Sequence, residues 1–290
     1  MSFRTVVIES RSKLDLRDGY IEIRDDMRRC RVFLDEISVL IIENPACTVT
    51  CCLLNALIEK KIKVMFCNRQ HLPHAELFPV AGSADFAGKL REQIAWRENI
   101  TECIWTHIIQ EKIRQQAKFL RNLNKTAEAD KLDRYAEQVL FGDPENKEGI
   151  SARLYFCTLF GSSFTRNDDT PLNSALNYGY IVLTSAFSRE ISACGYSTAL
   201  GFCHRSRINS LNLSCDLLEP FRIAVDRYVY AANYPQFGTD EKHHLVKFLE
   251  TEVQINGSRQ FLSNAIRIYL YSVFTAVREN DPEQIKFYTV

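Results

Sequence analysis

The chain has 290 residues, 46% of them hydrophobic and 25% charged, and its 36 basic and 36 acidic side chains give a formal net charge of zero. This composition is typical of a folded protein with room for two domains, and it excludes a disordered chain. The zero net charge argues against a general polyanion binder, and no apolar run approaches the ~20 residues that cross a bilayer.

The start of the chain and its cysteines indicate a compartment. The first residues, MSFRTVVIESRSK, lack the apolar core of a secretory signal. We therefore expect a cytoplasmic protein with no membrane association. In a reducing cytoplasm the ten cysteines are expected to be free thiols, mostly small buried hydrophobes.

The first 75 or so residues are predicted to be rich in strands. Runs of β-branched and aromatic residues occupy 5–10, 20–24 and 28–34. The dipeptide Asp18-Gly19 predicts a hairpin turn, because glycine accepts the positive φ that tight turns require. The sequence predicts two further strands and, between them, one helix that begins at a threonine cap. Together with the earlier strands they make a small sheet domain with one helix. The two strands are expected over 34–44 and 62–68, and the helix over 47–61.

A change in composition follows at 77–88, where Pro79, Gly82, Ser83 and Gly88 indicate a linker. Beyond it, the apolar spacing predicts helices to about residue 122, over 125–141, from Glu148 onward and over 174–191, with a polar loop over 162–173. The strand-like end, 285–290, is expected to dock on a partner subunit. We thus predict an α+β multidomain chain: a β-rich domain over 1–78, a linker over 79–88 and a helical domain over 89–290.

Three acids and one histidine in the second half are the candidate functional residues: Glu148, His204, Asp216 and Glu219. Asp216 and Glu219 are three residues apart, so on a helix they share one face and can point at one ion, and Pro220 ends or kinks that helix. Oxygen-rich ligands suit Mg²⁺ or Mn²⁺, and one imidazole favours Mn²⁺. The same residues are also compatible with structural salt bridges and a buried histidine, so the residue types alone leave both interpretations open.

A second set of residues has the spacing of a zinc site. Cys67, His71 and His74 lie close together, and the pair at 243–244 offers a further imidazole. The surrounding sequence predicts a strand, a turn and another strand, whereas zinc needs convergent, oriented ligands. Spacing alone therefore gives this set little weight.

Several strings resemble the CRISPR-associated endonuclease and integrase of the spacer-acquisition (adaptation) module. They are RTVVIESRSKL at 4–14, LDEISVLIIE at 34–43, EGISARLYF at 148–156, LNYGYIVL at 176–183, GYSTALGFCH at 195–204 and NLSCDLLEPFR at 212–222. They occur in the family's order with compatible spacing, nearly from end to end. The N-terminal strings are most similar to members from type II systems, and Cys203 before the histidine departs from the family pattern.

The resemblance implies a fold, a site and a reaction. It implies an N-terminal β-sandwich-like domain linked to an all-α catalytic domain, with Glu148, His204 and Glu219 as catalytic ligands of Mg²⁺ or Mn²⁺ and Asp216 as an accessory acid. It implies a homodimer that flanks a small CRISPR-associated partner dimer and acts on double-stranded DNA, both the prespacer and the CRISPR repeat. The implied reaction joins a 3′-hydroxyl to a phosphodiester at the repeat by transesterification, in antiviral defence.

Between residues 86 and 125 there are eight basic and four acidic residues. Taken alone, this excess of basic residues is typical of a solvent-exposed helix face. Beside a metal site they become candidate DNA contacts, together with two arginines further on. The candidates are Lys89, Arg91, Arg97, Lys112, Arg114, Arg205 and Arg222. Two other functions stay open: a metal-dependent nuclease or branched-DNA resolving enzyme in repair, and a non-catalytic DNA-binding subunit of an adaptation complex.

Overall fold

The computed structural model describes residues 4–25, 27–69, 73–77 and 85–289. The chain divides into two compact units, Met1–Ala84 and Asp85–Val290, each of which is described by itself. The division falls inside the predicted linker, most of which lies outside the described residues. The linker was predicted to run to residue 88, whereas the helix α2 (Phe86–Ile94) already begins at Phe86.

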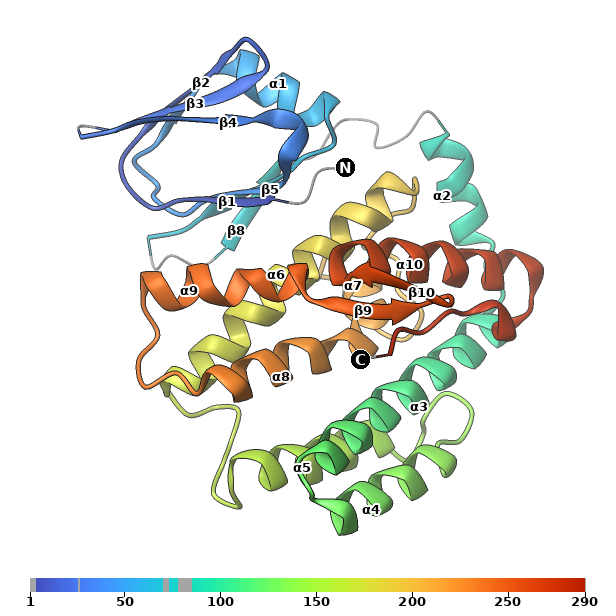
Figure 1. Cartoon of the computed structure of the whole chain (residues 1–290). Helices are drawn as coiled ribbons and strands as arrows, with labels where there is room; N and C mark the ends of the chain where they lie inside the picture. The colour runs from blue at the N-terminus through green and yellow to red at the C-terminus, as the bar shows by residue number, and fades with distance from the viewer. Residues whose placement is uncertain (1–3, 26, 70–72, 78–84, 290) are drawn as a thin grey trace. The chain divides into compact units, whose positions relative to one another are not determined.

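Over its described residues, the first unit consists of two four-stranded sheets, one α-helix and a short 3-10 helix (Figure 1). One sheet has the order β1-β5-β7-β8, with β1, β5 and β7 parallel and β8 antiparallel, and the other has the order β4-β3-β2-β6. The strands are β1 (Arg4–Ile8), β2 (Lys13–Arg17), β3 (Tyr20–Arg24), β4 (Arg29–Phe33), β5 (Ile37–Ile42), β6 (Thr48–Val49), β7 (Lys63–Cys67) and β8 (Pro73–Leu77).

The two sheets and the helix α1 (Cys51–Glu59) share one hydrophobic core. Every residue of the central strand β5 is buried, as expected for a parallel strand covered on both faces. The predicted hairpin is confirmed: Asp18 and Gly19 both have positive φ between β2 and β3. The predicted threonine cap is also confirmed, since the Thr50 side chain accepts a hydrogen bond from the Leu53 N–H.

The second unit is helical except for one hairpin. Its α-helices are α2 (Phe86–Ile94), α3 (Glu98–Asn122), α4 (Thr126–Glu137), α5 (Lys147–Phe160), α6 (Pro171–Ala193), α7 (Asn212–Leu217), α8 (Arg222–Ala232), α9 (Thr239–Val246) and α10 (Leu262–Glu279). Sequence reasoning missed the antiparallel pair β9 (Glu252–Ile255) and β10 (Ser258–Phe261). It also placed Pro171 in a loop, whereas the Thr170 cap and the proline in the first turn start α6 there.

Packing within this unit places α3, α4 and α5 side by side, and α6 contacts α7, α8, α9 and α10 (Figure 1). The C-terminal tail is not a strand of its own over the described residues. Thr289 instead exchanges backbone hydrogen bonds with Gln254 of β9, and Tyr288 is fully buried. The described part of the tail therefore packs on its own chain, and its docking on a partner subunit stays a prediction.

Candidate functional site

Glu148 lies in the first turn of α5, and the loop before that helix holds it in place. The Asn146 side chain caps the helix by accepting from the Gly149 N–H at 3.1 Å, with Asn146 itself in the left-handed region. Asp143 accepts hydrogen bonds from the N–H groups of Lys147 and Glu148, at 2.8 and 3.0 Å. The backbone position of Glu148 is thus fixed before its side chain makes any contact.

A buried ammonium group joins Glu148 to Glu219. Lys112, from the middle of α3, places its Nζ 2.7 Å from Glu148 Oε1 and 2.5 Å from Glu219 Oε2. The Glu219 side chain is 4% exposed and that of Glu148 is 28% exposed, so the site is open on the Glu148 side. The Arg222 Nε contacts the other oxygen of Glu219 at 2.8 Å.

These cations set the ionisation of Glu219. Burial by itself would raise its pKa, but the charges and hydrogen bonds of Arg222 and Lys112 outweigh burial and hold the pKa well below its usual range. Burial likewise opposes the charge on Lys112, but Glu219 and Glu148 raise the pKa of its ammonium. The cluster is therefore a fully charged network, with two carboxylates compensated by two cations.

His204 lies in a loop that folds around the carboxylate of Asp216. Asp216 is fully buried and accepts hydrogen bonds from the backbone N–H groups of Phe202, Cys203 and His204, at 2.6, 3.1 and 3.1 Å. Its Oδ1 also lies 2.5 Å from His204 Nδ1. With Nδ1–H donating to Asp216, the lone pair of His204 Nε2 is left for a ligand. This is the arrangement of a histidine oriented by a carboxylate.

Gly201 is required by the same packing. A Cβ at this position would lie 2.6 Å from Asp216 Oδ2 and 2.6 Å from the His204 carbonyl oxygen. Any side chain here would push the loop away from its acceptor. The Trp105 ring meets the His204 imidazole edge-on at 6.0 Å between centroids, which restricts the ring from the α3 side.

The two halves of the site act on each other electrostatically. The hydrogen bond to Asp216 raises the pKa of His204, and the charges of Asp216, Glu219 and Glu148 raise it further against the effect of burial. Burial raises the pKa of Cys203 to about 11, so its thiol stays protonated at neutral pH and is a poor soft ligand.

The donor set of Glu148, Glu219 and His204 fits a divalent cation in its chemistry. The two carboxylates already share one positive charge, and the His204 imidazole, whose Nε2 has no partner among the described residues, lies in their field. Among the residues that the structure describes, however, no three His, Cys, Asp or Glu side chains converge closely enough to hold a metal, and the Lys112 ammonium lies between the acids. Asp216 points at His204, so the prediction that it shares an ion directly with Glu219 does not match this geometry.

The other predicted residues are placed as follows. Arg91, Arg97, Arg114 and Arg205 are exposed, although Arg205 pairs with Glu98. Lys89 is partly buried and pairs with Glu92. Lys112 and Arg222 bind the acidic cluster, which favours a role inside the site over contact with DNA.

The rival zinc set can be placed only in part. Cys67 is a buried residue of β7. His71 lies outside the described residues, and the backbone of His74 belongs to β8. The chemistry that the structure does bring together is therefore in the second unit.

Lys112, which the sequence suggested as a DNA contact, lies inside the acidic cluster. It follows Ile108 by four residues and lies beside Ile113, so it occupies the buried stripe of α3. A lysine at a core position of an amphipathic helix needs a buried acid as partner, and that signal was present in the sequence. Which acids it meets depends on how α3 packs against α5 and the turn at Glu219.

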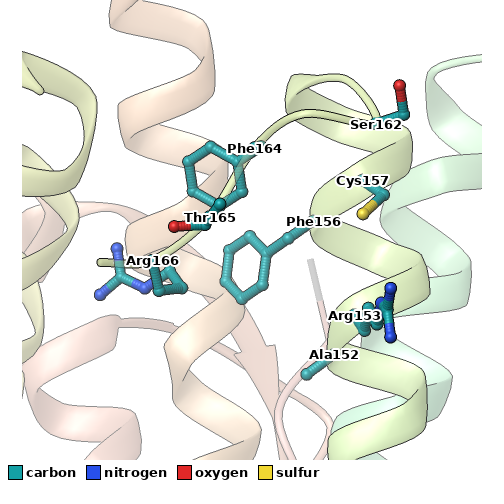
Figure 2. A pocket seen from close by; sticks show the side chains of 8 residues that line it. All are labelled: Ala152, Arg153, Phe156, Cys157, Ser162, Phe164, Thr165 and Arg166. Atoms are coloured by element: carbon teal, nitrogen blue, oxygen red, sulfur yellow. The ribbon is translucent and has the colours of Figure 1, made fainter. Parts of the chain in front are cut away.

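A cavity of about 480 Å³ lies one turn further along α5 (Figure 2). Its lining is aromatic and basic: Ala152, Arg153, Phe156, Cys157, Ser162, Phe164, Thr165 and Arg166. The Arg166 guanidinium lies over the Phe156 ring at 5.8 Å and over the Tyr180 ring at 5.3 Å. Ala152 follows Glu148 by four residues, so the cavity and the acidic cluster share one face of α5.

The comparisons with known proteins agree on one family. The family model described as "CRISPR associated protein Cas1" matches residues 5–243. A relative from Neisseria meningitidis serogroup C (strain 8013), named CRISPR-associated endonuclease Cas1, is 33% identical over 291 residues, covering 99% of this chain and 96% of the relative. The sequence-based prediction of the family is thereby confirmed.

Two solved structures share the fold at low identity. A casposase bound to integration product has a TM-score of 0.77 and 17% identity, covering 97% of this chain and 92% of that one. A chain of a Cas6-RT-Cas1–Cas2 complex has a TM-score of 0.76 and 16% identity; the match covers 97% of this chain but only 36% of that longer chain. Within the described residues, no helix is long and apolar enough to span a membrane.

Proposed function

This chain belongs to the Cas1 family of CRISPR-associated proteins, and from that membership and its acidic cluster we propose that it is a metal-dependent DNA endonuclease and integrase that inserts new spacers at a CRISPR repeat. The observation that carries the proposal is the pair of carboxylates, Glu148 and Glu219, sharing a buried cation beside His204. Its likeness in fold to a casposase bound to integration product supports the same reaction class.

In this proposal Glu148, Glu219 and His204 Nε2 hold a Mg²⁺ or Mn²⁺ ion. The bound ion would supply Lewis acidity to the scissile phosphate and to the reacting oxygens. Asp216 keeps the proton on His204 Nδ1 and so presents Nε2 as the ligand. Arg222 fixes Glu219 through Oε1, and Oε2, which accepts from the Lys112 ammonium, would be the oxygen offered to the ion.

The proposed reaction exchanges one phosphodiester for another. The 3′-hydroxyl of the incoming DNA attacks the phosphorus at the repeat edge, a new P–O bond forms, and the 3′-oxygen of the cleaved strand leaves with a proton. No water, energy source or covalent protein intermediate is needed, so no serine or tyrosine nucleophile is assigned. The exposed Arg153 of the adjacent cavity is available to contact phosphates.

The partners belong to the same proposal. We infer that the chain acts on double-stranded DNA as a homodimer together with a small CRISPR-associated partner dimer. The fold shared with a chain of a Cas6-RT-Cas1–Cas2 complex supports the assignment of that partner. A dimer flanking a partner would also explain how a chain with zero net charge handles DNA, because the phosphate contacts are divided among subunits.

The proposal predicts strand transfer that depends on a divalent metal. Purified protein with its small partner should join a short duplex with free 3′-hydroxyls to a repeat-containing plasmid in Mn²⁺ or Mg²⁺. Chelation should abolish the joined product, and added Mn²⁺ should restore it. A duplex with 3′-deoxy ends is the matched control and should give none.

The products of this assay separate the alternatives. Metal-dependent cleavage of branched or other DNA without joining would support a repair nuclease instead. DNA binding with no metal-dependent turnover would support a non-catalytic subunit. Either result would contradict the integrase assignment.

Replacing Asp216 by alanine should weaken Mn²⁺ binding by about 10–100-fold, because His204 loses the partner that orients it. The free energy of unfolding should also fall by about 1–3 kcal/mol, since buried donors lose their acceptor. Calorimetric titration with Mn²⁺ and denaturant unfolding would measure the two effects. Asp281→Ala, which removes a different aspartate that accepts a backbone N–H in the same unit, should leave Mn²⁺ binding unchanged.

A further inference from the structure

One face of the second sheet of the first unit carries an excess of positive charge. Side chains alternate along a strand, so one set from β2, β3 and β4 packs on the core, and the other set points away from it. The strand register aligns the outward set in three rows, which together we call the basic face. The rows are Lys13–Arg24–Arg29, Asp15–Glu22–Arg31 and Arg17–Tyr20–Phe33.

Glu22 lies at the centre of the basic face, beneath four arginines. Its Oε2 accepts hydrogen bonds from Arg29 Nη2 at 2.6 Å and from Arg31 at 2.9 and 3.1 Å. Arg24 and Arg17 lie 3.5 and 3.8 Å from its Oε1. The hydrogen bonds from Arg29 and Arg31 together lower the pKa of Glu22 to about 2, against the effect of burial. Glu22 is therefore ionised at any physiological pH.

The carboxylates of the basic face compensate only part of its charge. Five cations meet two acids, Glu22 and Asp15, the latter paired with Arg24. Placing like charges on neighbouring strands, about 5 Å apart, is unfavourable unless an anion is added. The four arginines that contact Glu22 have side chains that are 40–55% exposed. Glu22 therefore holds their guanidinium groups in place while they remain accessible to solvent.

The basic run of the helical unit differs in this respect. Arg121 is matched by both Asp130 and Asp133, Lys89 by Glu92, and Lys112 by two glutamates. These cations are compensated by acids of the same unit. The basic face therefore differs from these three helical sites because its cations outnumber its acids, while Arg91, Arg97 and Arg114 of the helical unit are also exposed.

We propose that the basic face binds the phosphate backbone of double-stranded DNA without reading its sequence. The proposal rests on the proposed function for the presence of DNA, and on the charge and register of β2–β4 for the place of binding. Guanidinium groups bind phosphate oxygens in a bidentate manner, and a surface of fixed arginines supplies affinity and orientation without contacting base edges. The exposed pair Tyr20 and Phe33, 5.1 Å apart at one edge, offers an apolar contact for deoxyribose.

The test compares two double variants: one removes two positive charges from the basic face, and the other removes two from the helical unit. Arg29→Gln/Arg31→Gln is compared with Arg121→Gln/Arg259→Gln, which removes two exposed arginines of the helical unit. Affinity for a duplex of about 30 base pairs is measured by fluorescence anisotropy from about 0.05 to 0.3 M KCl, with the full-length protein. The face variant should bind about 10-fold more weakly at 0.1 M salt, and the slope of log affinity against log salt should shrink by about 2. The matched control should change neither quantity.

A second variant guards against misfolding, because Arg29 and Arg31 satisfy the buried Glu22. Lys13→Gln/Arg17→Gln leaves both of those arginines in place and should still reduce the salt slope by about 2. Unchanged affinity and slope in both face variants would overturn the inference. Normal DNA binding with lost capture of the small partner would also overturn it, and would make the face a protein-docking surface.

The strand-transfer assay is scored separately on the wild type, which keeps the two proposals distinguishable. Wild-type protein that joins DNA, while the face variants bind it normally, would refute only the inference about the face. Wild-type protein that binds duplex DNA through the face but never joins strands would refute only the integrase assignment.

Discussion

His204→Ala is expected to abolish strand transfer, with a loss of more than about 100-fold, while leaving the fold and the oligomeric state unchanged. The imidazole is 46% exposed, so its removal costs little packing. Asp216 would keep its three backbone hydrogen bonds, and the loop that carries residue 204 would stay closed. The loss would therefore come from the missing Nε2 ligand rather than from unfolding.

Strand transfer into a repeat-containing plasmid, gel filtration and a thermal melt would test this expectation together. His107→Ala is the matched control, because His107 lies in the same unit on α3 and its ring contacts Cys103 and Glu283 rather than the acidic cluster. It should retain wild-type activity. Unchanged integration by His204→Ala would contradict the proposed site.

Glu219→Gln is expected to damage both stability and activity. The neutral amide would leave the Lys112 ammonium and the Arg222 guanidinium buried without their shared carboxylate. Breaking a buried ion pair by removing one partner costs about 3–5 kcal/mol of the free energy of unfolding. Strand transfer should fall by more than about 100-fold, since a ligand that carries negative charge is lost.

A double variant separates these two effects. Lys112→Met removes the ammonium, so Glu219→Gln/Lys112→Met should recover at least about 1–2 kcal/mol of stability relative to Glu219→Gln, with no recovery of strand transfer. Denaturant unfolding followed by tryptophan fluorescence suits the measurement, because both tryptophans, Trp96 and Trp105, lie in the helical unit. Recovery of activity in the double variant would show that Glu219 acts only as the partner of Lys112.

Most of the secondary structure followed from local sequence. The Asp18-Gly19 turn, the Thr50 cap and the apolar period of α3 are short-range signals, and each predicted its element. The errors occurred where neighbours along the chain carry little information. The hairpin β9–β10 is short and half polar, and its stability comes from packing on α10.

The sequence named the candidate site residues, but it did not predict how their side chains contact one another. The resemblance supplied Glu148, His204 and Glu219, whereas their separations in sequence said nothing about distance. An accessory place for Asp216 was implied only by the family, and it stays a prediction. The structure gives the physical reason for that place, because Asp216 accepts four hydrogen bonds from the 202–204 loop, including the one from His204 Nδ1.

Composition, periodicity and ordered motifs are properties of the linear chain. Composition and periodicity were enough to predict the two-part organisation, and the ordered motifs were enough to predict the family and the candidate residues. Only the tertiary structure decided that Lys112 neutralises Glu148 and Glu219, and that the outward arginines of three strands meet over Glu22. The first result depends on packing between segments that are remote in sequence. The second depends on the register in which neighbouring strands pair. Electrostatic energy depends on distance through space, and that distance is set only when the chain is folded.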